Sequence, residues 1–360
     1  MLKVLYVGMS SDLGGIEAFV MNYYRNIDRN KVQIDFLKFE KNICFEEEIV
    51  AGGGNVYQLP PRKFGLKYYY SLIKFFKAHK DYSYVHIHLN TCSSIAPVVI
   101  AKLFGAKVIA HSHNEWKGNA KITKLLHYIN KPILSKISNY KFACSDVAGK
   151  WLFEKNDEYI TVKNAIEAEG YVYNTEVRKE KRKELDISED FVIGHIGRFT
   201  YQKNHEFLLE VFKAVCDKNK NSKLLLIGTG ELREEIKKRV VSMGLKNNVI
   251  FTGIRSDIPD LLQAMDVFVF PSNFEGLGIV AVEAQAAGLK CIVSDRIPKE
   301  AFVTDLIEEV SLKQTKDIWA AEILKLNNRY ERTNTYKEIS EAGYDIKSSA
   351  LWLENFYINN

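Results

Sequence analysis

Residues 267–284 read VFVFPSNFEGLGIVAVEA and contain the clearest structural signal of the chain. The four apolar residues Val267–Phe270 have the composition of a buried strand, and a Pro-Ser turn follows them. After two further glycines, apolar residues at helical spacing predict a helix that begins near Gly278 and includes Glu283. A buried strand, a glycine-containing turn and a helix form the repeating unit of a parallel α/β sheet.

The same unit recurs on both sides of this stretch. The strand candidates are Lys3–Val7, Val32–Leu37, Val85–His88, Lys107–Ala110, Lys141–Cys144, Phe191–Ile196, Lys223–Ile227, Val249–Phe251, Val267–Phe270 and Lys290–Val293. Helical patterns separate them at Ile16–Ile27, Tyr69–Phe76, Ile95–Leu103, Glu206–Val215, Leu232–Val241, Ile279–Ala287 and Ile318–Leu326. This alternation predicts α/β, doubly wound parallel sheets, which bind ligands at the carboxyl ends of their strands.

The pattern breaks once, in the charged and non-periodic residues 167–190, which we interpret as the connection between two domains. A chain of 360 residues also suits two domains better than one. We therefore expect one Rossmann-like domain over residues 1–166 and a second over residues 167–345. A terminal helix within residues 346–360 is expected to pack back on the first domain.

Composition indicates a cytoplasmic globular protein. Apolar residues make up 46% and charged residues 26%, and no run of eighteen apolar residues occurs. The first residues lack the features of a signal peptide. The five cysteines are scattered without a Cys-x-x-Cys pair, which favours reduced thiols over a zinc site or a disulfide framework.

Basic residues gather in two stretches of the first half. Residues 61–80 contain no acidic residue and interleave Arg62, Lys63, Lys67, Lys74, Lys77 and Lys80 with Tyr68, Tyr69, Tyr70, Phe75 and Phe76. The second stretch places Lys117, Lys121, Lys124, Lys131, Lys136 and Lys141 around Leu125, Leu126, Ile129, Ile133 and Leu134. Such helices either lie on an anionic membrane surface or present a solvated face. Nucleic acid is less favoured, because no recognised binding motif accompanies the charge.

Two further strand ends in the second half carry residues suited to phosphate groups. Arg198 follows a strand after Gly197, and Lys203 stands at the opening of the next helix, so the two cations can clamp a diphosphate. Gly228 and Gly230 form another turn between a strand and a helix. A dinucleotide fingerprint is not supported there, because its third glycine and its later acidic residue are missing.

The first domain offers two candidate features. Gly15 lies in a Gly-Gly turn that precedes a helix. The turn either allows a ligand to approach the backbone closely or is a plain tight turn. His111 and His113 follow a strand, but no third ligand is apparent, so metal is the less favoured interpretation. We expect His86 and His88 to serve packing or hydrogen bonding.

These motifs resemble the family-four (group 1) retaining glycosyltransferases of the GT-B fold, over nearly the whole chain. The resemblance implies that Glu275 holds the transferred sugar, that Glu283 holds the nucleotide ribose, and that Arg198 and Lys203 neutralise the leaving group. It places His113 against the donor sugar and phosphate. The other implied donor-binding residues are Gly15, Gly197, Gly228, Gly230, Gly253, Arg255, Gly276, Leu277, Gly278 and Ile279. Ala165 stands where many relatives carry glycine.

The resemblance implies a retaining hexosyltransferase that uses neither metal nor cofactor, because the nucleotide sugar is itself a substrate. The expected donor is a UDP-sugar carrying a hexose or an N-acetylhexosamine. The expected acceptor is a glycan or a lipid-linked sugar in bacterial exopolysaccharide or capsule synthesis, at the inner face of the cytoplasmic membrane. Two alternatives stay open: a sugar-nucleotide 2-epimerase of the same fold, and a non-catalytic partner of another glycosyltransferase.

Overall fold

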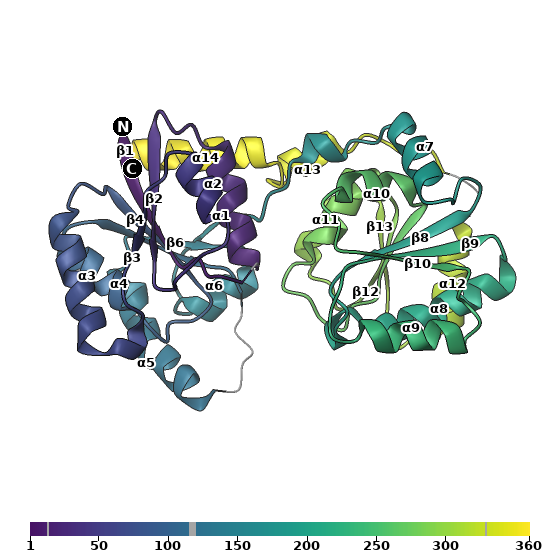
Figure 1. The fold of residues 1–360 in the computed structure, drawn as a ribbon, viewed down its shortest axis with the longest axis horizontal. Coiled ribbons are helices and arrows are strands. Elements are labelled where there is room, and N and C mark those ends of the chain that lie inside the picture. Colours follow the sequence, from purple (N-terminus) through teal and green to yellow (C-terminus); the bar gives the residue numbers. More distant parts are fainter. Residues whose placement is uncertain (13, 115–119, 328–329) are drawn as a thin grey trace. The chain divides into compact units, whose positions relative to one another are not determined.

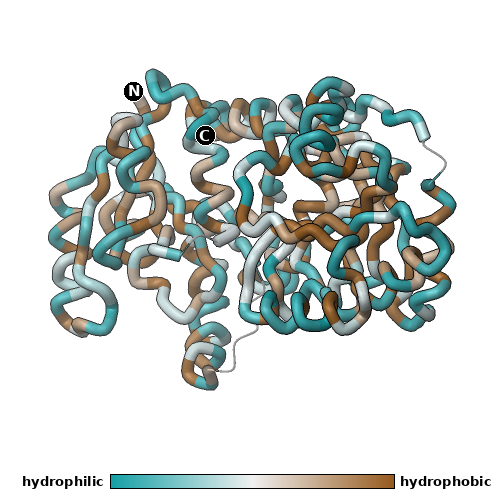
Figure 2. The backbone as a smooth tube through the Cα atoms, turned by 45° about the vertical axis from the view of Figure 1, so that its right-hand side comes forward, coloured by the Kyte–Doolittle hydropathy of each residue, from teal (hydrophilic) through white to brown (hydrophobic). Residues whose placement is uncertain are grey.

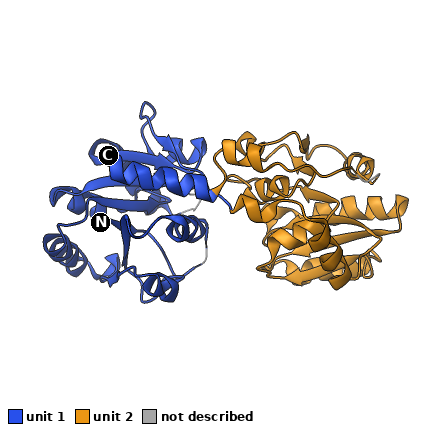
Figure 3. Ribbon diagram, turned by 90° about the horizontal axis from the view of Figure 1, so that it is seen from above, with its two compact units in different colours: residues 1–166, 346–360 blue, residues 167–345 orange. Residues whose placement is uncertain are grey.

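The computed structural model describes residues 1–12, 14–114, 120–327 and 330–360 (Figure 1). Leu13 of the Gly-Gly turn and Lys117 of the second basic stretch lie outside the described residues. The chain forms two compact units (Figure 3). Unit 1 contains residues 1–166 and 346–360, and unit 2 contains residues 167–345.

Unit 1 is built on a seven-stranded parallel sheet with the strand order β3-β2-β1-β4-β5-β6-β7. Its strands are β1 (Leu2–Val7), β2 (Val32–Lys38), β3 (Val56–Gln58), β4 (Tyr84–Leu89), β5 (Lys107–Ser112), β6 (Tyr140–Ala143) and β7 (Ile160–Thr161). The order reverses direction between β1 and β4, as in other doubly wound sheets. The short edge strands β3 and β7 were not predicted, since each contains too few residues to show a periodic pattern.

Helices cover both faces of this sheet. They are α1 (Gly15–Asn26), α2 (Glu46–Ala51), η1 (Arg62–Phe64), α3 (Leu66–Ala78), α4 (Ala96–Leu103), α5 (Lys121–Ile137), α6 (Asp146–Leu152) and α14 (Ile346–Asn359). Helices α1 and α14 contribute to one hydrophobic core, whereas α3, α4 and α5 contribute to the core on the opposite face. Figure 1 shows α14 lying beside α1. The C-terminal helix is thus part of unit 1.

Unit 2 contains a six-stranded parallel sheet with the strand order β10-β9-β8-β11-β12-β13. Its strands are β8 (Phe191–Ile196), β9 (Ser222–Ile227), β10 (Val249–Gly253), β11 (Val267–Phe270), β12 (Cys291–Ser294) and β13 (Ile307–Val310). Its helical segments are η2 (Ala168–Tyr171), α7 (Thr175–Glu184), η3 (Tyr201–Lys203), α8 (His205–Lys218), α9 (Arg233–Ser242), α10 (Ile258–Ala264), α11 (Ile279–Ala286), η4 (Lys299–Ala301), α12 (Lys316–Lys325) and α13 (Tyr336–Glu341). The prediction of doubly wound parallel sheets is confirmed.

The interpretation of residues 167–190 as a connection was wrong, because this charged stretch contains a helix of unit 2. Helix α7 begins after Asn174, whose side chain accepts hydrogen bonds from two backbone N–H groups of the first turn. Its face toward the unit is charged: Arg178 and Arg182 both pair with Asp266, at 2.5 and 3.2 Å. A buried ionic face has no apolar periodicity, so the pattern could not reveal this helix.

Hydropathy follows the layered structure. In Figure 2, hydrophobic residues recur along the helices between hydrophilic ones, as expected of helices that cover a sheet with one side. Among the described residues, no helix has the length and apolar content that crossing a bilayer requires.

Candidate active site

The glycine turns of unit 2 meet at the carboxyl ends of three adjacent strands, β8, β9 and β10. The Gly228 N–H donates to the Gly253 carbonyl oxygen at 2.8 Å. Gly228 has a φ of +134°, and a Cβ at this position would lie 2.2 Å from the Gly197 carbonyl oxygen. A side chain cannot be accommodated there without displacing backbone. At this sheet edge the glycine turns therefore pack backbone against backbone.

The loop after β8 and the loop after β11 are joined directly. The Asn273 N–H donates to the Gln202 carbonyl oxygen at 2.8 Å. In the opposite direction, the Asn204 side-chain amide donates to the Pro271 carbonyl oxygen at 3.1 Å. These bonds fix Lys203 and Glu275, which are 72 residues apart in sequence, next to each other.

Lys203 and Glu275 form a nearly buried ion pair. The Lys203 Nζ lies 2.8 Å from the Glu275 Oε1, and the two side chains are 15% and 7% exposed. Gln202 donates to the other carboxylate oxygen at 3.1 Å. The Lys203 ammonium also lies 4.5 Å from the centre of the Phe270 ring, within cation–π range. The lysine is thus held at the sheet edge with its charge shielded from water.

Arg198, unlike Lys203, has a side chain that is exposed and only weakly paired. Its side chain is 76% exposed, and its Nε lies 3.7 Å from an oxygen of Glu231, which is itself exposed. An exposed pair at this distance contributes little stability. The Arg198 guanidinium can therefore move to an incoming anion at small energetic cost.

Helix α11 begins directly after Gly278, which has a φ of +80°. The first backbone N–H groups of a helix favour an anion. Gly276 and Leu277 precede the helix, and Ile279 is its first residue. Of this group, Gly278 has the clearest conformational requirement, because the left-handed region favours glycine.

Glu283 occupies the fifth position of α11 and is largely buried. Burial raises the pKa of its carboxyl to about 7, although a hydrogen bond with Tyr171 and the Lys203 charge act in the opposite direction. A carboxyl with a pKa this close to neutrality is typical of functional sites, because water does not stabilise its charge. Glu283 and Glu275 thus differ: Glu275 is paired with a lysine, and Glu283 with a tyrosine hydroxyl.

Arg255 has its guanidinium engaged by carboxylates. It pairs with Asp257 at 2.6 Å and with Glu184 at 3.0 Å, and Lys181 pairs with Asp257 at 2.8 Å. The sequence motif did not indicate these partners. The predicted role of Arg255 beside a nucleotide base would require its backbone or apolar stem, since its charge is already compensated.

Four histidines come together in unit 1. His86 and His88 lie on β4, and His111 and His113 lie on and just beyond β5. Because these strands are adjacent, parallel and in register, all four side chains share one face of the sheet. His86 Nε2 hydrogen-bonds His111 Nδ1 at 3.0 Å, and His88 Nδ1 hydrogen-bonds His113 Nε2 at 2.8 Å. Burial lowers the pKa of His113 to about 3, so its ring is neutral at physiological pH.

The structure brings His111 together with two histidines of β4, but this group of three does not include His113. Ring nitrogens of His86, His88 and His111 all lie within 4.8 Å of one another, close enough to be considered for a metal ion. However, the His86 ring is nearly parallel to both the His88 and the His111 ring. Lone pairs of parallel rings do not converge on one point, and two of the nitrogens bond each other. The arrangement therefore matches hydrogen-bonded imidazole pairs better than a tetrahedral metal centre.

The Gly-Gly turn of unit 1 is fixed by a carboxylate. The Gly14 N–H donates to Glu17 Oε2 at 3.1 Å, and the Ser10 N–H donates to Glu17 Oε1 at 2.9 Å. This is the capping arrangement of a helix start. A Cβ on Gly15 would meet no atom within 4 Å, so local packing does not require glycine at this position.

Comparison with known proteins identifies the family. The profile of the glycosyl transferases group 1 matches residues 177–345, which include Glu275, Glu283, Arg198 and Lys203. EpsF of Bacillus subtilis (strain 168), which its name describes as a glycosyltransferase, is 32% identical over 370 residues and covers 99% of this chain and 96% of its own. The chain belongs to the group 1 glycosyltransferase family.

Further relatives of this group 1 glycosyltransferase agree in length and fold. CapH of Staphylococcus aureus, a capsular polysaccharide biosynthesis glycosyltransferase, is 25% identical over 91% of this chain and 92% of its own. HepE of Anabaena, crystallised with UDP and glucose, superposes with a TM-score of 0.77 at 16% identity over the full length of both chains. WaaG, a glycosyltransferase of lipopolysaccharide biosynthesis, gives 0.72 at 14% identity, over 99% of this chain and 100% of its own. The fold is therefore GT-B, as predicted.

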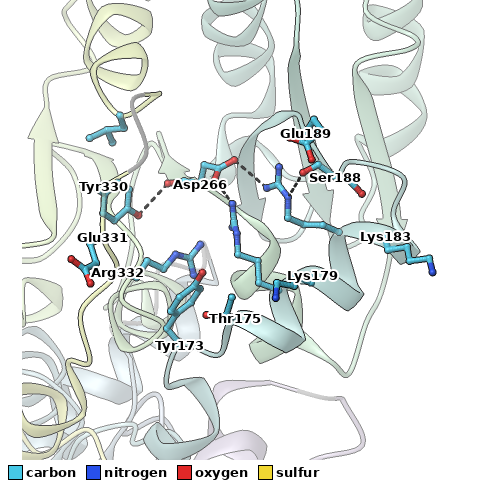
Figure 4. A pocket seen from close by; sticks show the side chains of 13 residues that line it. Tyr173, Thr175, Lys179, Lys183, Ser188, Glu189, Asp266, Tyr330, Glu331 and Arg332 are labelled. Carbon is cyan, nitrogen blue, oxygen red and sulfur yellow. Dashed lines mark hydrogen bonds and ion pairs between the residues drawn. The ribbon is translucent and has the colours of Figure 1, made fainter.

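A hollow of about 910 Å³ in the glycosyltransferase's unit 2 lies away from the candidate site, at the amino ends of β8 and β11 (Figure 4). Its arginines are already engaged. Asp266, labelled in Figure 4, accepts hydrogen bonds from Arg178 and Arg182. Arg332 donates to the carbonyls of Leu262 and Ala287. These contacts anchor α7 and the chain near Arg332 to the sheet, and they engage the arginine N–H donors that a phosphate would need.

Three residues of the candidate site escaped the sequence analysis. Gln202 donates a hydrogen bond to the second carboxylate oxygen of Glu275, and the Phe270 ring makes a cation–π contact with the Lys203 ammonium. Tyr171 hydrogen-bonds Glu283. Gln202 adjoins Lys203 in the quoted motif, so its position was a usable signal. Tyr171 lies 112 residues before Glu283, in the stretch interpreted as a connection. Nothing in the pattern indicated its role.

Proposed function

We propose that this glycosyltransferase transfers a hexose or an N-acetylhexosamine from a UDP-sugar to a glycan or lipid-linked acceptor with retention of anomeric configuration. The Lys203–Glu275 ion pair carries the proposal. It brings one shielded cation and one carboxylate together at the adjacent carboxyl ends of β8 and β11, beside the start of α11. A nucleotide sugar needs a cation for its diphosphate and an acceptor for its sugar hydroxyls at neighbouring points.

The diphosphate would contact Lys203, Arg198 and the first N–H groups of α11. As the bond between sugar and phosphate breaks, negative charge grows on the leaving diphosphate, and cations already in place stabilise this charge most effectively. Two cations and a helix start supply the stabilisation that a divalent ion gives in other enzymes. The sequence contains no Asp-x-Asp motif, which supports metal-independent transfer.

Retention would follow from attack on the face from which the diphosphate departs. The acceptor oxygen bonds to the anomeric carbon, the bond from that carbon to the phosphate oxygen breaks, and the acceptor proton passes to the released phosphate. Glu275 would orient sugar hydroxyls instead of attacking carbon, since Lys203 and Gln202 occupy its two oxygens. Glu283 would accept hydrogen bonds from the ribose hydroxyls. For His113, a neutral imidazole, the family resemblance implies contact with the donor sugar and phosphate.

The biological setting proposed is bacterial surface polysaccharide synthesis in the cytoplasm. EpsF covers almost the whole chain, and CapH, which also spans most of it, is named for capsular polysaccharide biosynthesis. HepE, whose fold is similar, was crystallised with UDP and with UDP-glucose, which supports UDP as the first donor nucleotide to test.

The test is a panel of UDP-, GDP- and ADP-sugars incubated with the purified chain in EDTA. Nucleotide release that requires an acceptor, together with an α-linked product by NMR from an α-linked donor, would support the proposal. Conversion of the donor sugar without any acceptor would assign the chain as a 2-epimerase. Absence of nucleotide binding, measured by thermal shift and calorimetry, would instead favour the non-catalytic partner.

A further inference from the structure

Helix α3 is apolar on two sides. Its buried side packs Tyr68, Leu72, Phe75 and Phe76 into the core of unit 1. A neighbouring side carries a second stripe at the spacing i, i+3, i+4, i+7, formed by Leu66, Tyr69, Tyr70 and Ile73, all of which are exposed. A surface helix of a globular protein normally has one such stripe. The second stripe of α3 therefore needs a separate explanation.

Helix α5 repeats the arrangement. Its exposed stripe consists of Ile122, Leu125, Tyr128, Ile129 and Ile133. Leu103, the last residue of α4, is also exposed. Because α4 packs against both α3 and α5, and all three cover the same face of the sheet, these side chains belong to one surface. We call this surface, made of the exposed residues of η1, α3, α4 and α5, the α3–α5 face.

The charge of this region is one-sided. Residues 62–145 contain fourteen lysine and arginine residues and two acidic residues, Asp81 and Glu115. The net charge of this segment is +12 in a chain of net charge +5, so the remainder is net negative. Among the residues that the structure describes, no lysine of α3 or α5 forms an ion pair with a carboxylate. Of these lysines, Lys131 donates a hydrogen bond to the Lys150 carbonyl oxygen at 3.0 Å.

We infer that the α3–α5 face is a docking surface for an anionic lipid bilayer. Exposed apolar side chains gain free energy when they enter the boundary between headgroups and acyl chains, and the flanking lysines attract anionic headgroups. A nucleic acid would use the lysines but offer no partner to Ile122, Leu125 or Ile129. The apolar stripe thus favours lipid over nucleic acid. This inference depends on unit 1 alone and is independent of the proposed transfer reaction.

The test uses flotation of the full chain with two kinds of vesicle, phosphatidylcholine alone and phosphatidylcholine containing phosphatidylglycerol. The variant K121Q/L125S removes one lysine and one apolar side chain of α5. Its matched control is K238Q/V241S on α9 of unit 2, because Leu125 and Val241 are 60% and 61% exposed. No nucleotide sugar is present, so failure here does not bear on catalysis.

We expect the wild-type chain and the control to bind anionic vesicles more than tenfold better than neutral ones. The affinity of K121Q/L125S for anionic vesicles should fall roughly fivefold through loss of the lysine alone, and it should fall further through loss of the leucine. Salt of about 0.5 M should weaken binding of the wild type. Equal binding by K121Q/L125S and the wild type, or no preference for anionic vesicles, would overturn the inference. Binding to duplex DNA without binding to vesicles would assign the face to nucleic acid.

Discussion

The Lys203 ammonium and the Glu275 carboxylate neutralise each other at 2.8 Å inside the candidate donor site. A charge-compensated lysine can be buried without a bound anion, which an uncompensated lysine could not. On the proposed function, a bound diphosphate would give Lys203 a second anionic neighbour and would make Glu275 available to sugar hydroxyls. The pair would then couple recognition of the phosphate to recognition of the sugar.

Glu275→Gln should separate turnover from nucleotide binding. The amide keeps the shape but orients the sugar hydroxyls poorly, so kcat should fall by roughly 10²–10³-fold while the Kd for UDP stays within about threefold. Steady-state kinetics and calorimetry measure the two quantities. Glu231→Gln, at the exposed partner of Arg198, is the control and should keep kcat nearly unchanged. Parallel loss of affinity and turnover in Glu275→Gln would contradict the assignment.

Lys203→Met should weaken UDP binding by roughly 10²-fold, and it should also destabilise the chain by about 3 kcal/mol because Glu275 is left buried without its partner. The double variant K203M/E275Q removes both charges. We expect it to recover most of the stability, measured by urea unfolding, without recovering UDP affinity. Recovery of both would mean that Lys203 serves the fold alone.

Glu283 should give both stability and binding a pH dependence. Its pKa of about 7 in the folded chain lies above its ordinary value of 4.5, so the folded chain holds a proton that the unfolded chain has released between those values. Stability should therefore fall as pH rises through this window, by on the order of 3 kcal/mol. Glu283→Gln should lack this fall.

Affinity for UDP should change in the opposite direction, because an ionised Glu283 is the better acceptor for ribose hydroxyls. We expect the Kd of the wild type to decrease severalfold between pH ~6 and ~8. Calorimetry across this range on the wild type and on Glu283→Gln provides the comparison. The same pH profile in both proteins would remove Glu283 from the binding site.

Gly228→Ala should be among the most damaging glycine substitutions, since its Cβ would lie 2.2 Å from the Gly197 carbonyl oxygen. We expect a loss of more than about 3 kcal/mol in the free energy of unfolding, together with loss of UDP binding. Gly244→Ala is the matched control. Gly244 also has a positive φ, of +70°, but its Cβ would meet nothing within 4 Å, so backbone strain of about 1 kcal/mol is expected.

Tyr357→Phe tests the attachment of α14. The Tyr357 hydroxyl bonds His86 Nδ1 at 2.6 Å and the Tyr6 hydroxyl at 2.9 Å, and all three groups are buried. Removal of the Tyr357 hydroxyl should lower the free energy of unfolding by roughly 1–3 kcal/mol, because two buried polar atoms lose a hydrogen-bond partner. Thermal unfolding reports the loss. Tyr70→Phe, at an exposed tyrosine of α3, should leave the melting temperature unchanged.

The strands and the family could be read from the sequence because their signals are local. An apolar run such as Val267–Phe270 between turns shows a buried strand, and the Glu275–Glu283 spacing resembles the family motif. Contacts between distant segments gave no such signal. Helix α7 was missed because its inner face is ionic, and the link between Tyr171 and Glu283 depends on tertiary packing. The histidine pairs could not be predicted from the sequence, because they depend on the register of β4 against β5.

The return of α14 to unit 1 has a consequence for synthesis of the chain. Unit 2 is continuous over residues 167–345, so every residue of its core has been synthesised before residues 346–360 are made. Unit 1 must wait for those fifteen residues, because Tyr357 and Leu353 complete its core. We therefore expect the second unit to finish folding first, reversing the usual N-terminal-first order. A nascent chain stalled before residue 346 would carry an open apolar groove along α1.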